Sequence, residues 1–369
     1  MNPIDKPRPF DRRSPGVQIL DPLGQRTDHP DFPLEVDADL LQQLYLDLTL
    51  ARRVDAECVA LQRQGELGLW TSALGQEAAQ VGSARALEAD DFIFPSYREH
   101  GVALVRGLDP LRLVAQFRGV SGPTWRPEEH NMAPYQLVLG TQTLHAAGYA
   151  MGLQRDRKES AVIVYFGDGA TSQGDVGEAF TWAAVHNLPV VFFCQNNQWA
   201  ISTPTELQHR APIFQRAAGY GFEGIRVDGN DVLACLAVTR HALDNARAGN
   251  GPTLIEAFTY RLNGHSTSDD PTKYREDAEL HDWHSRDPLA RLRSHLTLLG
   301  LATDEFLAVT HQAADNVAGL VRRGTLEMKD PSPLSLFDHV YADAPAHLVA
   351  QRAEMADYLA SFVEPRAHG

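Results

Sequence analysis

The stretch AVIVYFGDGATSQGDVGEAFTWAAVHNLPVVFFCQNNQWAIS, residues 161–202, decides the fold of this chain. It contains two short apolar runs, AVIVYF and PVVFFC, separated by a segment that is long enough for a helix. Short apolar strands that alternate with helices are typical of a parallel sheet covered on both faces. We therefore predict a strand at 161–166, a helix at about 174–187 and a second strand at 189–194.

The same alternation extends to both sides of this unit. The patterns predict helices from Asp37 or Asp39 to Gly65, at 76–88 and at 140–155, and a strand at 252–261. They also predict a short buried strand with a turn into a new helix within 92–101, and a short strand with a turn within 224–231. The fold class is therefore α/β, a mostly parallel sheet with helices on both faces. We divide the chain into an extended N-terminal arm at 1–36, one domain at 37–345 and a C-terminal helical tail at 346–369.

Polar residues follow both strands of the central unit. Asp168, flanked by glycines, comes directly after the first strand, and Asn197 follows the second. In a right-handed β-α-β unit both strand ends lie at one edge of the sheet, where open α/β sheets bind ligands. Carboxylate and amide oxygens suit Mg²⁺, and the backbone of Gly169 and Ala170, at the entry to the next helix, favours an anion. A tight turn would explain the Gly-Asp-Gly motif alone, but both clusters together favour a magnesium-bridged diphosphate site.

Composition excludes several other classes of protein. The net charge of −15 and the pI near 5.4 argue against nucleic acid or an anionic membrane as the main partner. The three cysteines form no CxxC pair, so a structural zinc site or a disulfide framework is not expected. We see neither a secretory signal nor an apolar run of transmembrane length, and we expect a cytoplasmic protein.

Several motifs together resemble one family. They are SYREHG (96–101), GTQTLHAAG (140–148), GDGATSQGD (167–175), NNQWAIS (196–202), RVDGND (226–231) and GHSTSDDPTKYR (264–275). The chain is similar, over about residues 40–345, to the α subunit of the E1 component of thiamine diphosphate-dependent 2-oxoacid dehydrogenase complexes. The forms HSTSDDPTKYR and NNQWAIS look most like the branched-chain type, with the pyruvate type close behind.

The resemblance implies cofactor contacts for particular residues. The side chains of Asp168 and Asn197 and the carbonyl oxygen of Trp199 match the family's Mg²⁺ ligands. Tyr97 and Arg98 match a pair beside the diphosphate, onto which a guanidinium group can fork.

Other positions correspond less clearly to residues of the family. Leu137 and Leu139 match residues whose backbone faces the aminopyrimidine ring, although core packing is an alternative. Thr141 and Gln142 match a site for a monovalent cation, K⁺, in some branched-chain members. Gln195 departs from an arginine found in some of those members, which weakens any phosphate role for it.

Two histidines are catalytic candidates. His265 matches the family's active-site histidine near the diphosphate, where it can contact an anion or pass a proton. His145 is as well explained by a satisfied core position as by catalysis. Arg261 could brace the His265 loop, and Ser266 and Ser268 match a loop that is phosphorylated in mitochondrial relatives.

The resemblance also implies partners. The chain shows one diphosphate-binding unit, and the family places the pyrimidine-binding domain on a separate β chain. The expected protein is an α₂β₂ enzyme that decarboxylates branched-chain 2-oxo acids and passes the acyl group to the lipoyl group of E2. Alternatives are a pyruvate or acetoin substrate, a catalytically silent assembly subunit, and a dinucleotide-binding dehydrogenase. The last is disfavoured because no GxGxxG opens a β-α-β unit.

Overall fold

A five-stranded parallel sheet forms the centre of the molecule, in the order β1-β2-β3-β7-β6. The computed structural model describes residue 14, residues 16–120 and residues 125–362. The strands are β1 (Phe92–Phe94), β2 (Val162–Gly167), β3 (Val190–Asn196), β6 (Glu223–Asp228) and β7 (Thr253–Phe258). Every neighbouring pair in this sheet is parallel, which confirms the predicted α/β fold.

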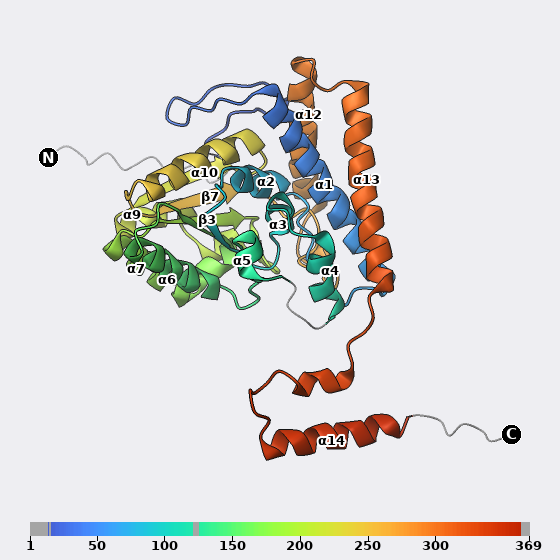
Figure 1. Ribbon diagram of the computed structural model, residues 1–369. Coiled ribbons are helices and arrows are strands. Elements are labelled where there is room, and N and C mark those ends of the chain that lie inside the picture. The colour runs from blue at the N-terminus through green and yellow to red at the C-terminus, as the bar shows by residue number, and fades with distance from the viewer. Residues whose placement is uncertain (1–13, 15, 121–124, 363–369) are drawn as a thin grey trace.

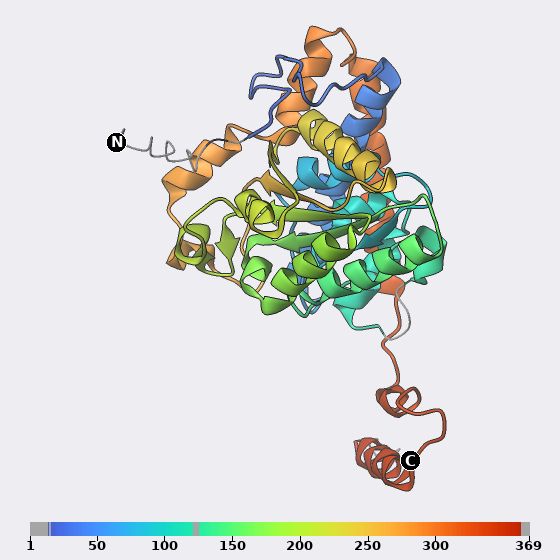
Figure 2. The same cartoon turned by 90° about the vertical axis from the view of Figure 1, so that its left-hand side faces the viewer.

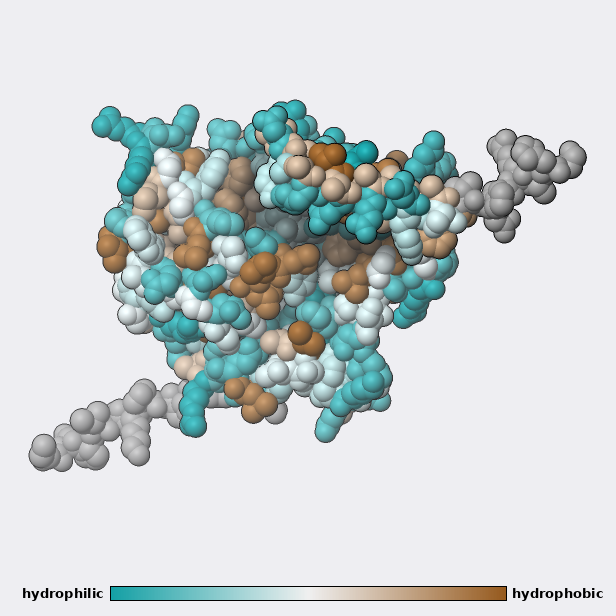
Figure 3. Space-filling model, turned by 90° about the horizontal axis from the view of Figure 1, so that it is seen from below, coloured by the Kyte–Doolittle hydropathy of each residue, from teal (hydrophilic) through white to brown (hydrophobic). Residues whose placement is uncertain are grey.

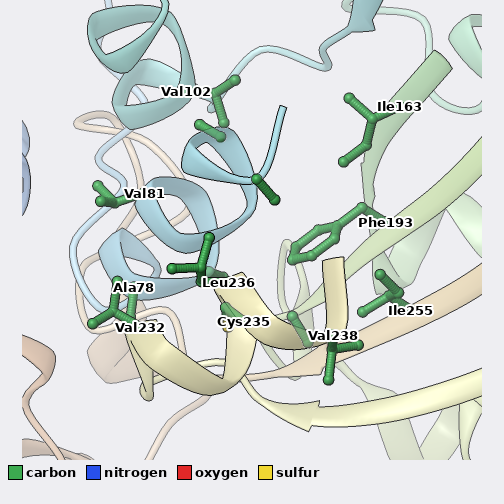
Figure 4. Close-up of a cluster of buried hydrophobic side chains, with 14 of the residues drawn as sticks. Ala78, Val81, Val102, Ile163, Phe193, Val232, Cys235, Leu236, Val238 and Ile255 are labelled. Carbon is green, nitrogen blue, oxygen red and sulfur yellow. The ribbon is translucent and has the colours of Figure 1, made fainter. Parts of the chain in front are cut away.

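Alternation along the strands builds two apolar layers. On β3, Val191 and Phe193 face one layer with helices α1 (Ala38–Arg63), α2 (Glu77–Arg85), α3 (His100–Val105) and α10 (Val232–Arg247). Val190 and Phe192 face the other layer, with α6 (Thr141–Arg155), α7 (Gly174–His186) and α9 (Arg216–Tyr220). Figure 4 shows the first layer, and Figure 2 shows helices above and below the sheet. Because successive residues of a strand point to opposite faces, continuous apolar runs fill both layers.

The remaining helices and short elements surround this core. They are α4 (Pro110–Arg118), α5 (Pro127–His130), η1 (Asp168–Ser172), α8 (Thr205–Gln208), η2 (Ile213–Gln215), η3 (Pro271–Lys273), α11 (Asp277–His284), α12 (Pro288–Leu298), α13 (Asp304–Glu327), η4 (Pro333–Phe337) and α14 (Ala346–Ala360). A two-stranded antiparallel ribbon, β4 (Trp199–Ala200) with β5 (Thr203–Pro204), follows β3.

Helix α2 packs inside the chain. A Cβ atom added to Gly82 would lie 2.6 Å from the carbonyl oxygen of Val232 and 2.7 Å from the Cβ atom of Cys235. The small residues of this helix therefore allow close approach of α10, as Figure 4 shows. Helix α6, the other helix rich in small residues, has an exposed outer side that includes Gly148 and Tyr149.

The N-terminal segment packs on the far edge of the sheet. Val17 forms a parallel bridge to Val227 of β6, and Asp231 accepts the backbone N–H groups of Ile19 (2.7 Å) and Leu20 (2.6 Å). Of the two outcomes expected for the arm, packing on the rest of the chain is found at Val17, Ile19 and Leu20. Residues 1–13 and 15 of the predicted arm lie outside the described residues.

The C-terminal segment extends away from the body of the molecule. After α13 the chain leaves the core, and η4 and α14 pack on each other below it in Figure 1. Residues 363–369 of the predicted tail lie outside the described residues, as do residues 121–124. None of the helices in the described part of the chain combines the length and apolar character that a transmembrane segment requires.

Candidate functional site

The predicted polar clusters meet at one edge of the sheet. Gly167, the last residue of β2, is paired in register with Gln195 of β3, so Asp168 and Asn197 follow adjacent strand ends. Both line a cavity of about 410 Å³ at the carboxyl ends of the strands. The expectation that they lie on the same edge is confirmed, and the reason is the parallel register of β2 and β3.

Asp168 is buried and held by donors from one loop. Thr205 Oγ1 donates to its Oδ2 atom at 3.0 Å, and Gln208 Nε2 lies 3.3 Å from the same atom. Burial raises the pKa of Asp168 from 3.8 to about 6, although both donors and Arg261 lower it. Burial thus makes the charged carboxylate costly, and a cation beside it would offset that cost.

Close packing forces a glycine next to Asp168. A Cβ atom on Gly169 would lie 2.7 Å from the Cβ atom of Ala200. The ribbon β4–β5 therefore lies directly over the turn that follows β2.

Asn197 presents its amide in a defined direction. Its Nδ2 atom donates to Gln76 Oε1 at 2.7 Å, and its Oδ1 atom accepts the backbone N–H of Trp199 at 3.2 Å. The carbonyl oxygen of Trp199 accepts from Arg261 Nη1 at 3.1 Å. The structure thus brings together the three residues predicted as metal ligands, since all three line the cavity.

Two buried arginines flank His265. Arg98 donates to the carbonyl oxygen of Ser72 (2.6 Å) and to that of His265 (2.9 Å), and its Nη2 lies 3.5 Å from His265 Nδ1. Arg261 Nη1 lies 3.3 Å from the same ring nitrogen. Because a guanidinium group only donates, Nδ1 accepts and Nε2 carries the ring proton.

Burial, together with the charge of the two arginines, keeps His265 neutral. Burial, reinforced by Arg98 and Arg261, lowers the pKa of His265 from 6.5 to about 4. At neutral pH the ring is therefore uncharged and can donate a hydrogen bond from Nε2.

The arginines lack a carboxylate partner. Arg98 is 5% exposed and Arg261 is 0% exposed, and among the described residues neither forms an ion pair with a carboxylate. A buried charge without a counter-charge is costly, so an anionic ligand would complete this site. Arg98 and His265 both line the cavity and could contact such an anion.

The oxygen atoms near Asp168 suit a hard cation. In the described part of the chain, His, Cys, Asp and Glu do not gather in groups of three or more that could hold a metal ion. A cation here would therefore take one carboxylate together with neutral amide and carbonyl oxygens. Mg²⁺ binds in this manner and completes its shell with phosphate oxygens and water. The residues present thus fit a magnesium diphosphate group.

The other predicted cofactor contacts also line this cavity. Tyr97, Leu137, Leu139, Gly169 and Ala170 all contribute to its wall. Leu137 is 65% exposed and lies at the rim, so it is not explained by core packing.

The catalytic candidate His145 and the cation-site candidate Gln142 lie in different environments. His145 is exposed on the outer side of α6 and does not line the cavity, so the structure does not bring it together with His265. Gln142 is buried at the cavity, and its Oε1 atom has no hydrogen-bond partner while its Nε2 donates to the carbonyl oxygen of Tyr165.

Sequence reasoning missed a set of buried polar residues behind Asn197. These residues are Gln76, Gln80 and Glu99, which contact each other or Gln195. Burial raises the pKa of Glu99. The two glutamines are four residues apart in a region of small residues, and this spacing is the one signal that could have indicated them.

A second, larger cavity lies at the same edge of the sheet, beyond β3. Its volume is about 920 Å³, and its wall includes Asn196, Glu256 and Arg286. Asn196 Nδ2 donates to Glu256 Oε1 at 2.7 Å, and Arg286 forms an ion pair with Asp282. Each of these three polar residues is thus paired with another side chain. Trp199 lines both cavities.

Comparison with known proteins agrees with the geometry. A family model described as "Dehydrogenase E1 component" matches residues 47–323. The chain belongs to this family. Residues 47–323 include the sheet and every residue that lines the cavity, so the match covers the candidate site as well as the fold.

Individual relatives extend over almost the whole chain. A 3-methyl-2-oxobutanoate dehydrogenase subunit alpha of Mycobacterium tuberculosis (strain ATCC 25618 / H37Rv) is 45% identical over 353 residues, 93% of this chain and 94% of that protein. A pyruvate dehydrogenase E1 component subunit alpha of Staphylococcus aureus (strain N315) is 38% identical over 339 residues, 91% of each chain. The protein of that name from Bacillus subtilis (strain 168) is 36% identical over 337 residues, 90% of each.

Proposed function

We propose that this protein is the α subunit of a thiamine diphosphate-dependent 2-oxoacid dehydrogenase that acts on branched-chain 2-oxo acids. The observation that carries the proposal is the joint placement of Arg98, His265, Asp168 and Asn197 around one cavity. Two of these groups suit a diphosphate and two suit the cation that bridges it. The 45% identical relative, named as acting on 3-methyl-2-oxobutanoate, supports the substrate class.

The roles of the metal-binding groups follow from their chemistry. Asp168 supplies the one charged oxygen, and Asn197 Oδ1 and the carbonyl oxygen of Trp199 supply neutral ones. The backbone N–H groups of Gly169 and Ala170 lie in the first turn of η1, where such groups favour an anion. Together these groups hold the diphosphate and fix the position of the cofactor.

Arg98 and His265 have different proposed roles: Arg98 binds the diphosphate, and His265 donates a proton. Arg98 offsets the diphosphate charge, and Tyr97 lies beside it, with the Arg98 guanidinium carbon 5.5 Å from its ring centroid. His265 holds a proton at Nε2 at neutral pH and can donate it to an anionic group in the cavity. Bound thiamine diphosphate supplies the carbanion chemistry that decarboxylation of a 2-oxo acid requires.

A monovalent cation is a further part of the proposal. Gln142 Oε1 is a buried acceptor without a hydrogen-bond partner, and such an atom is costly unless an ion, a water or another donor approaches it. K⁺ at this atom, with Thr141 beside it in the chain, would satisfy it and would brace the wall of the cavity. This agrees with the match of both residues to a cation site in some branched-chain members.

We propose that the active site is completed by a β chain in an α₂β₂ enzyme. The described residues form one five-stranded parallel sheet and one two-stranded ribbon, and the cavity is open at a rim that includes the exposed Leu137 and Ile201. Apolar residues that are exposed at the mouth of a site are typical of a surface buried by another chain. A pyrimidine-binding domain from a second chain would cover this rim, and a lipoylated E2 would receive the acyl group.

Apolar surface elsewhere is consistent with assembly. Figure 3 looks from the side on which the C-terminal segment projects and shows apolar side chains near the centre of that face. The segment itself exposes Leu336, Val349, Tyr358 and Phe362. Exposed groups of this size favour partner contact over a free monomer.

Among alternatives, pyruvate is the second candidate substrate, because relatives at 36–38% identity are named as pyruvate dehydrogenases. A silent assembly subunit is disfavoured, because Asp168, Asn197 and His265 line one cavity.

The test is to co-express the chain with its candidate β partner and to compare decarboxylation of 3-methyl-2-oxobutanoate and pyruvate. We expect the higher kcat/KM for the branched substrate, with some activity on both, because one methylene group gives only about 10- to 200-fold discrimination. A higher kcat/KM for pyruvate would contradict the substrate class but not the cofactor chemistry.

A further inference from the structure

A chain of buried side-chain amides ends at Asn197. Asn197 Nδ2 donates to Gln76 Oε1 at 2.7 Å, and Gln76 Nε2 donates to Gln195 Oε1 at 3.0 Å. Gln195 Nε2 in turn donates to Glu99 Oε1 at 2.7 Å. All four side chains are at least nine-tenths buried, so every one of these bonds is shielded from water.

The donor-to-acceptor direction of these amide hydrogen bonds is set by Glu99, at the end opposite Asn197. Ser96 Oγ, the backbone N–H of Arg98 and Gln195 Nε2 all donate to the carboxyl group of Glu99. Ser96 Oγ approaches both carboxyl oxygens as a donor, so these oxygens act as acceptors and Gln195 turns its NH₂ group toward Glu99 Oε1. Its oxygen then faces Gln76 and requires a donor.

A second anchor imposes the same direction. Gln80 Oε1 accepts the backbone N–H of Gly101 at 2.8 Å, and Gln80 Nε2 donates to the carbonyl oxygen of Arg98 at 3.0 Å. Backbone groups cannot exchange their roles, so the amide of Gln80 has one orientation. The same Nε2 atom donates to Gln195 Oε1 at 3.1 Å, which fixes the oxygen of Gln195 on the side of Gln76.

We propose that this amide chain orients Asn197, with Gln76 as the positioning residue that turns the Oδ1 atom, rather than the NH₂ group, toward the metal ion. An asparagine turned the other way would present two N–H groups to a cation. Because Gln76 Oε1 accepts from Nδ2, the opposite end of the Asn197 amide is left as the acceptor. The inference rests on the proposed function, which makes Asn197 a metal ligand.

The first test measures Mn²⁺ binding in the presence of thiamine diphosphate by electron paramagnetic resonance, with the full chain co-purified with its partner. Gln76→Met keeps the volume but removes the acceptor, and we expect the Kd for Mn²⁺ to rise about 10- to 100-fold, as for other groups that orient metal ligands. Gln80→Met is the matched control. It removes a buried amide that does not contact Asn197, and Glu99 still holds Gln195 in the same orientation. We therefore expect a similar loss of Tm but less than about a threefold change in Kd.

The second test uses a variant in which the orientation of the side chain at position 197 no longer affects metal binding. In Asn197→Asp both ends of the side chain are oxygen, so adding Gln76→Met should change the Kd for Mn²⁺ by less than about threefold. A role in folding alone would lower metal affinity equally in both backgrounds and would overturn the inference. If Gln76→Met does not fold, Gln195→Met decides, because it removes the acceptor that holds Gln76 in place and should weaken Mn²⁺ binding in the same direction.

The outcomes separate this inference from the proposed function. If Asn197→Ala leaves Mn²⁺ binding unchanged, the metal assignment fails and the proposed function with it. If Asn197→Ala weakens binding but Gln76→Met and Gln80→Met have equal effects on Kd, only the positioning role of Gln76 is overturned.

Discussion

Asn196 and Asn197 are adjacent, buried to a similar degree and located at the end of the same strand, yet they face different cavities. Asn196 faces the larger one, where it bonds to Glu256. Asn197 faces the smaller one, which contains Asp168, Arg98 and a neutral His265.

The difference between the cavities lies in how their polar groups are satisfied. In the larger cavity Asn196 bonds to Glu256. In the smaller cavity Arg98 donates to carbonyl oxygens and forms no ion pair with a carboxylate of the described residues, and burial raises the pKa of Asp168. We infer that incomplete charge, more than volume, marks the place where a ligand binds.

The largest expected effect separates the two asparagines directly. Asn197→Ala removes an oxygen from the proposed metal site, and we expect the Mg²⁺-dependent affinity for thiamine diphosphate to fall by more than about 100-fold, beyond the range for groups that merely orient a ligand. Asn196→Ala is the matched control and should change this affinity by less than about threefold. Calorimetric titration measures both, and equal effects would break the distinction between the cavities.

His265 tests whether the smaller cavity performs chemistry as well as binding. His265→Ala removes the proton at Nε2, and we expect acyl transfer to a lipoyl substrate to fall roughly 100-fold, the usual scale for a positioned acid–base group. Affinity for thiamine diphosphate should change less than about tenfold. Near-normal transfer would leave this histidine with a structural role only.

Replacing a buried carboxylate by the corresponding amide should have opposite effects on stability in the two cavities. Burial raises the pKa of Asp168 to about 6, so the folded state binds this proton more tightly than the unfolded state does. This contribution to stability is fully present below about pH 4 and is lost as the pH rises through 6. In metal-free protein at pH 7.5, Asp168→Asn should therefore increase the free energy of unfolding by about 2 kcal/mol.

Glu256 provides the control for this effect. It accepts from Asn196 Nδ2 and from the backbone N–H of Phe214 at 3.0 Å, so Glu256→Gln should reduce the free energy of unfolding. Thermal denaturation at pH 7.5 and at pH 5 measures both variants. We expect the gain for Asp168→Asn to shrink at the lower pH, and a gain of equal size at both would contradict the assignment to this carboxyl group.

The smallest predicted effect is on the pH dependence of metal binding. A proton on Asp168 competes with the cation, so with a pKa of about 6 the Mg²⁺-dependent affinity at pH 5 should be about tenfold lower than at pH 8. Titrations at a series of pH values test this. A flat profile between pH 5 and 8 would show that another group controls metal binding.

Much of the fold and part of the site could be predicted from the sequence. The strands β2 and β3 are continuous apolar runs, and parallel topology then brings Asp168 and Asn197 to one edge without further information. The start of α1 was also predictable, since Asp37 accepts the backbone N–H of Leu40 as an N-cap.

The rest depended on contacts between distant parts of the chain. Gln76 and Asn197 are 121 residues apart, and neither residue alone indicates the bond between them. The outward position of His145 depends on which face of α6 packs on the sheet, and small residues on all sides of that helix leave this choice open. The full burial of Arg261 arises from the ribbon and loop around it, which have little periodicity.

The packing of the N-terminal segment has a consequence for the timing of synthesis. Gly24 and Leu20 are held by His295 and Arg291, each 271 residues farther along the chain. At about 5–20 residues per second, a ribosome needs roughly 15 to 50 s to make that intervening length. The N-terminal segment therefore leaves the ribosome roughly 15 to 50 s before the helix that it packs against has been made. During this interval Ile19 and Leu20, almost fully buried in the finished protein, are exposed to chaperones and proteases.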